Sequence, residues 1–249
     1  MLRVYLAGKV AVEDGGILVP EKRFPGRQGR LAFAILAWER QRATSLAELA
    51  DILWDDEPPN AWETALRALV SKLRAALGES ASIEHAFGCY QLRLPAGAWV
   101  DVEACDAAIH EAETAFRGGE FERAMGSALV ANAIARRPFL PGDVGSWTER
   151  KREHLRRVRV RALEVRGRVA LACGDPAGAA TDAEIVLDLD PYRESAYALL
   201  MQAHVASGNP ALALTEYERL RTRLAEDLGT QPSAATEAVF LDVLRARGC

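Results

Sequence analysis

Residues 48–77 read ELADILWDDEPPNAWETALRALVSKLRAAL, two helix-like runs separated by an acidic connection that contains two prolines. In the second run, leucine and valine recur at helical spacing until Gly78, which predicts an amphipathic helix with one side facing a core. Asn60 is expected to cap the start of this helix. The opposite side would then carry the basic residues, so this helix is the first candidate for a partner-binding surface.

The flanking residues extend this pattern into a small domain. Residues 14–16 (Asp-Gly-Gly) predict a hairpin between two strands, and residues 28–40 show helical periodicity. Ser45, followed three positions later by Glu48, predicts the capped start of another helix. Residues 82–94 (SIEHAFGCYQLRL) predict two strands around a turn. Strands, three helices and a hairpin in this order predict a winged helix-turn-helix with an N-terminal sheet.

The chain beyond Asp101 is alanine-rich and helical, and it contains an internal repeat. GDPAGAATDAEIVL, starting at Gly174, aligns with GNPALALTEYERL, starting at Gly208, and the offset of 34 residues is typical of tetratricopeptide helix pairs. A weaker copy starts at Gly118, and Gly167 is expected at a close contact between helices. The prediction is a mainly α protein, with a winged helix over residues 1–97 and an all-α, tetratricopeptide-like array over residues 98–249.

Composition limits the classes of function that remain open. The 249 residues carry a net charge of −4, and residues 1–100 hold 12 basic and 12 acidic side chains. A globally basic nucleic-acid binder is therefore excluded, and any such binding must come from local patches. No segment approaches the roughly 20 apolar residues of a membrane span. The four cysteines are far apart, which argues against a disulfide framework or a zinc site and favours a cytoplasmic location.

The helix over residues 61–77 is the strongest candidate for contact with DNA. With its leucines turned inward, its other side would present polar and basic residues, and the hairpin adds a histidine; the candidates are Thr64, Arg67, Ala68, Ser71, Lys72, Arg74 and His85. In a winged helix the third helix enters the major groove, where Arg and Lys bind phosphates and guanine edges and hydroxyls reach bases. The alternative is a hydrated amphipathic surface without a partner.

Three stretches together resemble one family of bacterial regulators. Residues 26–77, which include LWDDEPP and SKLRAAL, resemble the DNA-binding half of the antibiotic regulatory protein (SARP) family of actinobacterial activators. Residues 87–108 (FGCYQLRLPAGAWVDVEACDAA) resemble its wing and the junction that follows. Residues 101–249, ending in LRTRLAEDLGTQPSAATEAVFLDVL, resemble its bacterial transcriptional activator domain. The resemblance covers essentially the whole chain.

This resemblance implies a transcriptional activator that binds direct repeats in promoter DNA and recruits RNA polymerase, with no cofactor and no membrane partner. Binding to repeats also allows a homodimer on DNA. In winged helices of the OmpR/PhoB type, the loop before the third helix faces the polymerase. Here that loop would present Asp55, Asp56 and Glu57. Alternatively, these acids only stabilise the following helix by interacting with the positive, N-terminal end of its dipole.

The sequence departs from the family at the predicted DNA surface. Family wings usually carry basic residues, whereas this hairpin has Glu84 and His85, and the third helix has Glu63 near its start. A second class of function therefore stays open: a helical-repeat scaffold for protein partners whose winged helix no longer reads DNA. An enzyme is not expected, because the histidines are scattered and no HExxH or GxxxxGK[ST] motif occurs.

A second basic segment lies between Arg150 and Arg168, where nine Lys and Arg accompany only two Glu. Its apolar positions predict a helix with an inward stripe and arginines around the outside. The arginines singled out as an auxiliary binding surface are Arg156, Arg157, Arg159 and Arg161. Arginine suits contact with DNA phosphate or with an acidic protein, but pairing with acids of the same domain is the other interpretation.

Overall fold

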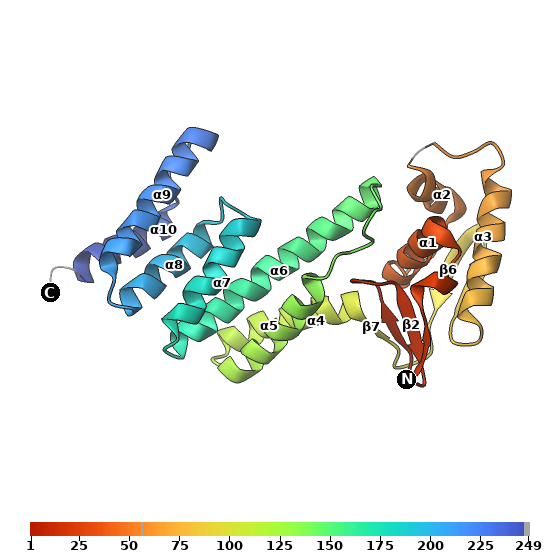
Figure 1. Ribbon diagram of the computed structural model, residues 1–249, viewed down its shortest axis with the longest axis horizontal. Coiled ribbons are helices and arrows are strands. Elements are labelled where there is room, and N and C mark those ends of the chain that lie inside the picture. The colour runs from red at the N-terminus through yellow and green to blue at the C-terminus, as the bar shows by residue number, and fades with distance from the viewer. Residues whose placement is uncertain (56, 247–249) are drawn as a thin grey trace. The chain divides into compact units, whose positions relative to one another are not determined.

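The structure is a computed structural model that describes residues 1–55 and 57–246 (Figure 1). The chain forms two compact units. The first unit contains Met1–Asp106 and Ile134–Leu155, and the second contains Ala107–Ala133 and Arg156–Cys249. The first unit therefore combines two separate parts of the chain, and the predicted boundary after residue 97 lies inside it.

An N-terminal sheet occupies one side of the first unit. It has the strand order β3-β2-β1-β7, formed by β1 (Arg3–Tyr5), β2 (Ala11–Asp14), β3 (Ile17–Val19) and β7 (Trp99–Val100). β1, β2 and β3 pair antiparallel, and β7 pairs parallel with β1. Gly15 and Gly16 have φ values of +55° and +86°, a conformation that glycine adopts without a steric penalty. The predicted hairpin is thus confirmed.

Helix α4 (Asp101–Arg117) begins directly after β7, and its first residue fastens the sheet. The Asp101 carboxylate is fully buried and accepts hydrogen bonds from the backbone N–H groups of Leu6, Ala7 and Val102, at 2.8–2.9 Å. Burial raises the pKa of Asp101 even though these three donors stabilise the carboxylate. The end of β1 is therefore tied to a residue almost one hundred positions later.

Three helices and a second sheet complete the predicted order of elements. The helices are α1 (Gly26–Trp38), α2 (Leu46–Trp54) and α3 (Trp62–Leu77), and a short 3-10 helix (Glu21–Arg23) precedes them. The second sheet has the order β4-β6-β5, from β4 (Thr44–Ser45), β5 (Ser82–Ala86) and β6 (Cys89–Arg93). The helices contact one another around a core that includes Phe33, Ile35 and Leu49.

The helix boundaries follow local signals with one exception. Ser45 is the N-cap of α2 and accepts a hydrogen bond from the Glu48 N–H at 3.1 Å, as predicted. Gly78 ends α3 with a φ of +60°. The prediction that Asn60 caps α3 is wrong. The Trp62 N–H donates to the Pro59 carbonyl in a turn, so the N-cap position moves to Ala61, whose side chain accepts nothing.

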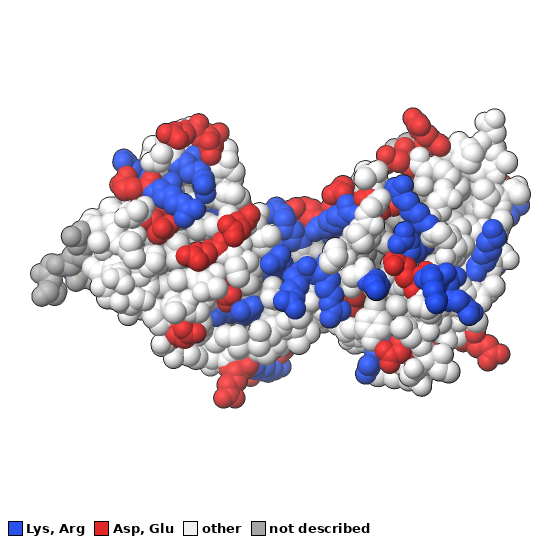
Figure 2. All heavy atoms as spheres, viewed as in Figure 1, with Lys and Arg blue, Asp and Glu red and all other residues white. Residues whose placement is uncertain are grey.

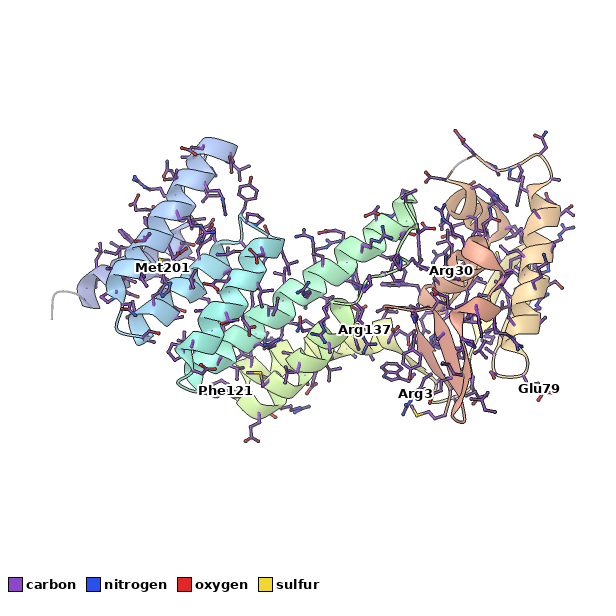
Figure 3. All side chains as sticks on the ribbon, viewed as in Figure 1. Arg3, Arg30, Glu79, Phe121, Arg137 and Met201 are labelled. Carbon is purple, nitrogen blue, oxygen red and sulfur yellow. The ribbon has the colours of Figure 1, made fainter. Side chains whose placement is uncertain are left out.

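The second unit consists of helices that include α5 (Phe121–Ala135), α6 (Ser146–Ala172), α7 (Pro176–Leu189), α8 (Glu194–Ala206), α9 (Pro210–Leu228) and α10 (Ala234–Ala246). The first part of α4, the last two residues of α5 and the first part of α6 belong to the first unit, and the rest of α4 belongs to the second. α8 contacts α7, α9 and α10. Ala179 and Ala213, which are equivalent positions of the 34-residue repeat, are both fully buried, as is Met201, labelled in Figure 3.

Two contacts inside the second unit are particularly tight. A Cβ atom added at Gly167 would lie only 2.6 Å from Leu199 Cδ2, so the close approach predicted for Gly167 is confirmed. Nearby, the buried Glu164 carboxylate accepts hydrogen bonds from Arg193 Nε at 2.8 Å, from Arg193 Nη2 at 3.0 Å, and from the Ser195 hydroxyl. Burial opposes the ionisation of Glu164, but Arg193 and Ser195 outweigh it and hold its pKa below the ordinary value.

The protein is therefore mainly helical, with two small sheets at its N-terminal end. Over residues 1–55 and 57–246, none of the helices combines the length and the apolar character that crossing a bilayer requires.

Candidate nucleic-acid interface

Helix α3 has one fully buried side and one exposed side. Leu66, Val70 and Leu73 have no exposed surface, because they pack toward α1 and α2. All the predicted DNA contacts on this helix lie on the exposed side: Thr64, Arg67, Ala68, Ser71, Lys72 and Arg74. The structure therefore brings these six residues together along one helix, which Figure 3 shows ending just before the labelled Glu79.

Arg67 lies at the middle of this surface and forms an ion pair with Glu63. Arg67 Nη2 is 3.1 Å from a Glu63 carboxylate oxygen, and the two side chains are 62% and 56% exposed. An ion pair this exposed contributes at most about 1 kcal/mol, because water screens it. Another anion can consequently replace Glu63 as the partner of Arg67 with little loss of free energy.

Arg74 has a role that the sequence did not reveal. Its Nε and Nη2 atoms both donate to the carbonyl oxygen of Ile83, at 2.9 and 2.6 Å. The guanidinium carbon also lies 6.0 Å from the centre of the Tyr90 ring. Arg74 therefore joins α3 to both strands of the β5–β6 hairpin and fixes the hairpin relative to the helix. A single arginine in a helical pattern gives no signal for such a partner.

The β5–β6 hairpin presents a mostly uncharged surface. His85 is exposed, and its ring lies 4.8 Å from the Tyr90 ring, centre to centre. Glu84 forms an ion pair with Arg93 Nε at 2.8 Å. The turn consists of Phe87 and Gly88, both with positive φ, and Phe87 is fully exposed. The sequence predicted the turn but attached no role to Phe87.

The connection between α2 and α3 is exposed along its described residues. Asp55 caps the C-terminus of α2 in the left-handed conformation, with a φ of +51°, and the Glu57 N–H donates to the Trp54 carbonyl. The side chains of Asp55 and Glu57 point into solvent, where a partner can reach them. Asp56, the third predicted acid, lies outside the described residues.

An ion-pair cluster holds the start of α2 in place. Arg42 pairs with Glu48 of α2 and with Glu39, and Lys151 Nζ lies 2.9 Å from Glu39 Oε1. Lys151 also lies over the ring of Trp38, 4.8 Å from its centre. The Arg42 guanidinium lowers the pKa of Glu48 from its ordinary value. These contacts are all within the first unit, and they support the helix pair from which α3 projects.

The arginine-rich part of α6 in the second unit is more embedded than predicted. Arg156, Arg159 and Arg161 are half-buried rather than arranged around an exposed surface, and only Arg157 of the four is exposed. Arg156 donates to the carbonyl of Leu189, the last residue of α7, at 2.6 Å. The expectation that these arginines all surround the outside is wrong.

Arg161 forms an ion pair with an acidic residue of its own unit. Its Nε and Nη2 atoms each lie 2.7 Å from an oxygen of Glu113 on α4, and this guanidinium lowers the pKa of Glu113. The geometry therefore favours pairing within the unit over an auxiliary binding surface. On the face drawn in Figure 2, Lys and Arg side chains gather along α6, with Asp and Glu side chains beside some of them.

These features place the chain in a class of proteins that combine a three-helix unit carrying a strand hairpin with a series of paired helices. Comparison with known protein families identifies the family within this class. The chain belongs to the bacterial transcriptional activator domain family, whose profile matches residues 100–244.

Individual relatives agree with this assignment. The chain is 29% identical to regulatory protein AfsR of Streptomyces coelicolor over 94% of its own length and 27% of AfsR. It is 27% identical to regulatory protein DnrI of Streptomyces peucetius over 95% of its length and 89% of DnrI. The predicted resemblance to SARP-type regulators is thereby confirmed, and the named relatives are regulatory proteins.

A solved structure extends the likeness to almost the whole chain. Mycobacterium tuberculosis EmbR, solved in complex with a low affinity phosphopeptide, superimposes with a TM-score of 0.87 at 26% identity. The match covers 98% of this chain and 65% of the EmbR chain. The chain thus spans about a quarter of AfsR and less than two thirds of the EmbR chain.

Proposed function

We propose that the chain is a transcriptional activator that binds promoter DNA as a winged helix, with α3 in the major groove and the β5–β6 hairpin beside it. The observation that carries this proposal is the surface of α3. Leu66, Val70 and Leu73 on its apolar side are fully buried, while Thr64, Arg67, Ser71 and Lys72 remain exposed on a helix that Arg74 joins to the hairpin. A surface helix fixed to a hairpin has the rigidity that base recognition requires.

The exposed side chains match the chemistry of a DNA duplex. Arg67 and Lys72 can neutralise phosphates or bind guanine O6 and N7, and the Ser71 and Thr64 hydroxyls can reach bases or phosphates. Glu63 would release Arg67 when a phosphate replaces it, because the exposed pair is weak. The resemblance to the SARP family implies direct repeats in a promoter as the target, and we propose that two copies of the chain bind them side by side in the cytoplasm.

We further propose that the connection between α2 and α3 contacts RNA polymerase. Asp55 and Glu57 are exposed, and the prolines at positions 58 and 59 restrict the backbone that follows. An acidic loop would be repelled by DNA phosphates but attracted to a basic protein surface. This arrangement separates the DNA-binding surface from the activating one.

The experiment that tests DNA binding compares affinities over a salt series. The probe is a duplex from the promoter upstream of the protein's own gene, and the variant carries Arg67→Gln and Lys72→Gln. Each lost phosphate contact removes about 0.9 from the slope of log affinity against log salt, so the slope should fall by roughly 2. Arg221→Gln is the matched control, because it removes an equally exposed arginine paired with Glu218 in the second unit.

Unchanged affinity in the double variant, with the fold intact, would refute the assignment. It would favour the second candidate, a protein-interaction scaffold. One observation supports that candidate: Glu63 neutralises Arg67, and Arg74 is already engaged by the hairpin, so the surface carries little uncompensated positive charge.

A separate experiment tests the activating loop. Asp55→Asn combined with Glu57→Gln removes two negative charges, and Asn also tolerates the left-handed conformation observed at position 55. Promoter affinity should stay the same or rise slightly, whereas transcription by purified RNA polymerase should decrease. Full activation by this variant would show that Asp55 and Glu57 have no role in contacting polymerase.

A further inference from the structure

A cleft opens on the first unit between α2 and the beginning of α6. Its volume is about 930 Å³, within the roughly 300–1,000 Å³ that is typical of small-molecule sites. Its walls come from the end of α1 and the loop that follows, from α2, and from residues 146–154 of α6, all of which belong to the first unit. None of the candidate DNA contacts lines it, so the cleft is a separate feature of that unit.

The aromatic part of the cleft consists of two tryptophans that pack edge to face. The ring centres of Trp38 and Trp147 are 6.3 Å apart, and the ring planes make an angle of 82°. Lys151 Nζ lies 4.8 Å from the centre of the Trp38 ring and 5.4 Å from that of Trp147. Trp147 is buried, whereas Trp38 is only partly buried. Trp38 therefore offers indole surface on which a flat apolar group can pack.

Four of the charged side chains that line the cleft neutralise one another. Glu39 pairs with both Lys151 and Arg42, and Arg42 also pairs with Glu48. Burial opposes the ionisation of Glu39, but Lys151 and Arg42 outweigh it and lower the pKa of this carboxyl. Two carboxylates and two cations thus cancel, and their network holds the walls of the cleft in place.

Two further charged side chains line the cleft and are not used by the fold. Asp51 extends from α2 and Arg150 from α6, and both are exposed. Within the part of the chain that the structure describes, neither side chain makes a hydrogen bond or an ion pair. His154, which also lines the cleft, is bonded to Asp106 at 2.8 Å. The cleft therefore combines an accessible indole with one uncompensated anion and one uncompensated cation, which lie on different helices.

We propose that this cleft binds a small aromatic molecule that carries both an ammonium and a carboxylate group, as aromatic amino acids and their derivatives do. The aromatic part packs on Trp38, Asp51 accepts hydrogen bonds from the ammonium, and Arg150 donates to the carboxylate. A ligand with a single charge would leave either Asp51 or Arg150 without a partner, so the cleft selects zwitterions. This inference goes beyond the proposed function and does not depend on DNA binding by α3.

The test uses a fluorescent zwitterion and two probes that each lack one of its charges. Nε-dansyl-lysine joins a naphthalene ring to an ammonium and a carboxylate, and its emission increases when the ring leaves water. Dansylcadaverine lacks the carboxylate, and dansyl-6-aminohexanoate lacks the ammonium. The full chain should bind dansyl-lysine about tenfold more tightly than either of the other probes, as expected for one charge-assisted hydrogen bond.

Two substitutions test the role of each charge, and each serves as the control for the other. Arg150→Gln should weaken the binding of dansyl-lysine about tenfold and leave that of dansylcadaverine unchanged, because dansylcadaverine has no carboxylate to lose. Asp51→Asn should weaken dansyl-lysine to the same extent and leave dansyl-6-aminohexanoate unchanged. Both side chains are exposed, and the probe that keeps its affinity in each variant shows that the cleft is intact. Arg221→Gln, in the second unit, should alter none of the affinities.

The outcomes separate this inference from adventitious binding and from the proposed function. No binding of dansyl-lysine at millimolar concentration would overturn it. Equal affinities for the three probes would overturn it as well, because the naphthalene ring alone would then account for binding. An effect of one substitution without the other would mean that the cleft recognises a single charge, and the zwitterion would be wrong. None of these results bears on DNA binding, which the salt series tests separately.

Discussion

Replacing Arg193 with methionine should destabilise the second unit strongly and in a pH-dependent way. Methionine replaces the aliphatic part of the side chain but not the guanidinium. Among the described side chains, the Glu164 carboxylate, 8% exposed, then keeps the Ser195 hydroxyl as its hydrogen-bond partner and Arg168 as a nearby charge. Removing one member of a buried ion pair typically costs about 3–5 kcal/mol, because the remaining charge is neither hydrated nor paired. Since Ser195 remains, we expect about 3 kcal/mol at pH 7.

The pH dependence follows from the folded-state pKa of Glu164, which differs between the wild type and the variant. In the wild type the pKa of Glu164 is lowered, so its stabilisation is present above the unfolded pKa of about 4.3 and is lost only as the pH falls through the lower folded value. In Arg193→Met, burial dominates and raises the folded pKa above that of the unfolded chain. The variant therefore regains stability as the pH falls through this raised pKa, and the difference from wild type narrows between pH 7 and pH 5.

Urea unfolding followed by far-UV circular dichroism at both pH values measures this difference. At a typical slope of 2–3 kcal/mol per molar, the midpoint should shift by roughly 1 M at pH 7. The control is Arg221→Met, whose partner Glu218 is 53% exposed, and it should cost less than about 1 kcal/mol at either pH. Equal costs for the two substitutions, or a cost for Arg193→Met that does not change with pH, would refute the reasoning.

Two further predictions concern packing and capping. Gly167→Ala places a Cβ 2.6 Å from Leu199 Cδ2 and should lower the free energy of unfolding by about 1–3 kcal/mol, measured by thermal unfolding. Gly126→Ala, on α5 with no atom near the added Cβ, is the control and should be neutral or stabilising. Similar effects of the two substitutions would contradict the close contact at Gly167. Ser45→Ala removes the N-cap of α2 and should cost about 1 kcal/mol, and an unchanged melting temperature would show that the Glu48 N–H finds another acceptor.

The elements that the sequence predicts well are those with strong local signals. The apolar stripe of α3, the Ser45 cap, the glycine turn at 15–16 and the 34-residue repeat all depend on residues close together in the chain, and each is present. β4 and β7 were missed because a two-residue strand has no periodicity. The parallel pairing of β7 with β1 joins segments almost one hundred residues apart, which no local pattern encodes.

Some features of the candidate site also follow from local sequence patterns, and others do not. Helical periodicity is sufficient to place residues such as Thr64 and Ser71 on the exposed side of α3, and the structure agrees. What periodicity cannot predict is how the charges pair. Arg74 bonds to the hairpin and Arg161 to Glu113 because of tertiary contacts, so an arginine that looks available in the sequence is already engaged in the fold.

The dependence of β1 on Asp101 and β7 has a consequence for how the protein is made. A ribosome releases the chain from its N-terminus, but the N-terminal sheet cannot be completed until residues 99–101 have emerged. The first unit also needs Ile134–Leu155, which are translated after Ala107–Ala133 of the second unit. At 5–20 residues per second, the stretch from 106 to 155 takes roughly 2 to 10 s. Throughout that interval the emerging first unit lacks its last segment, which is when a nascent chain depends most on chaperones.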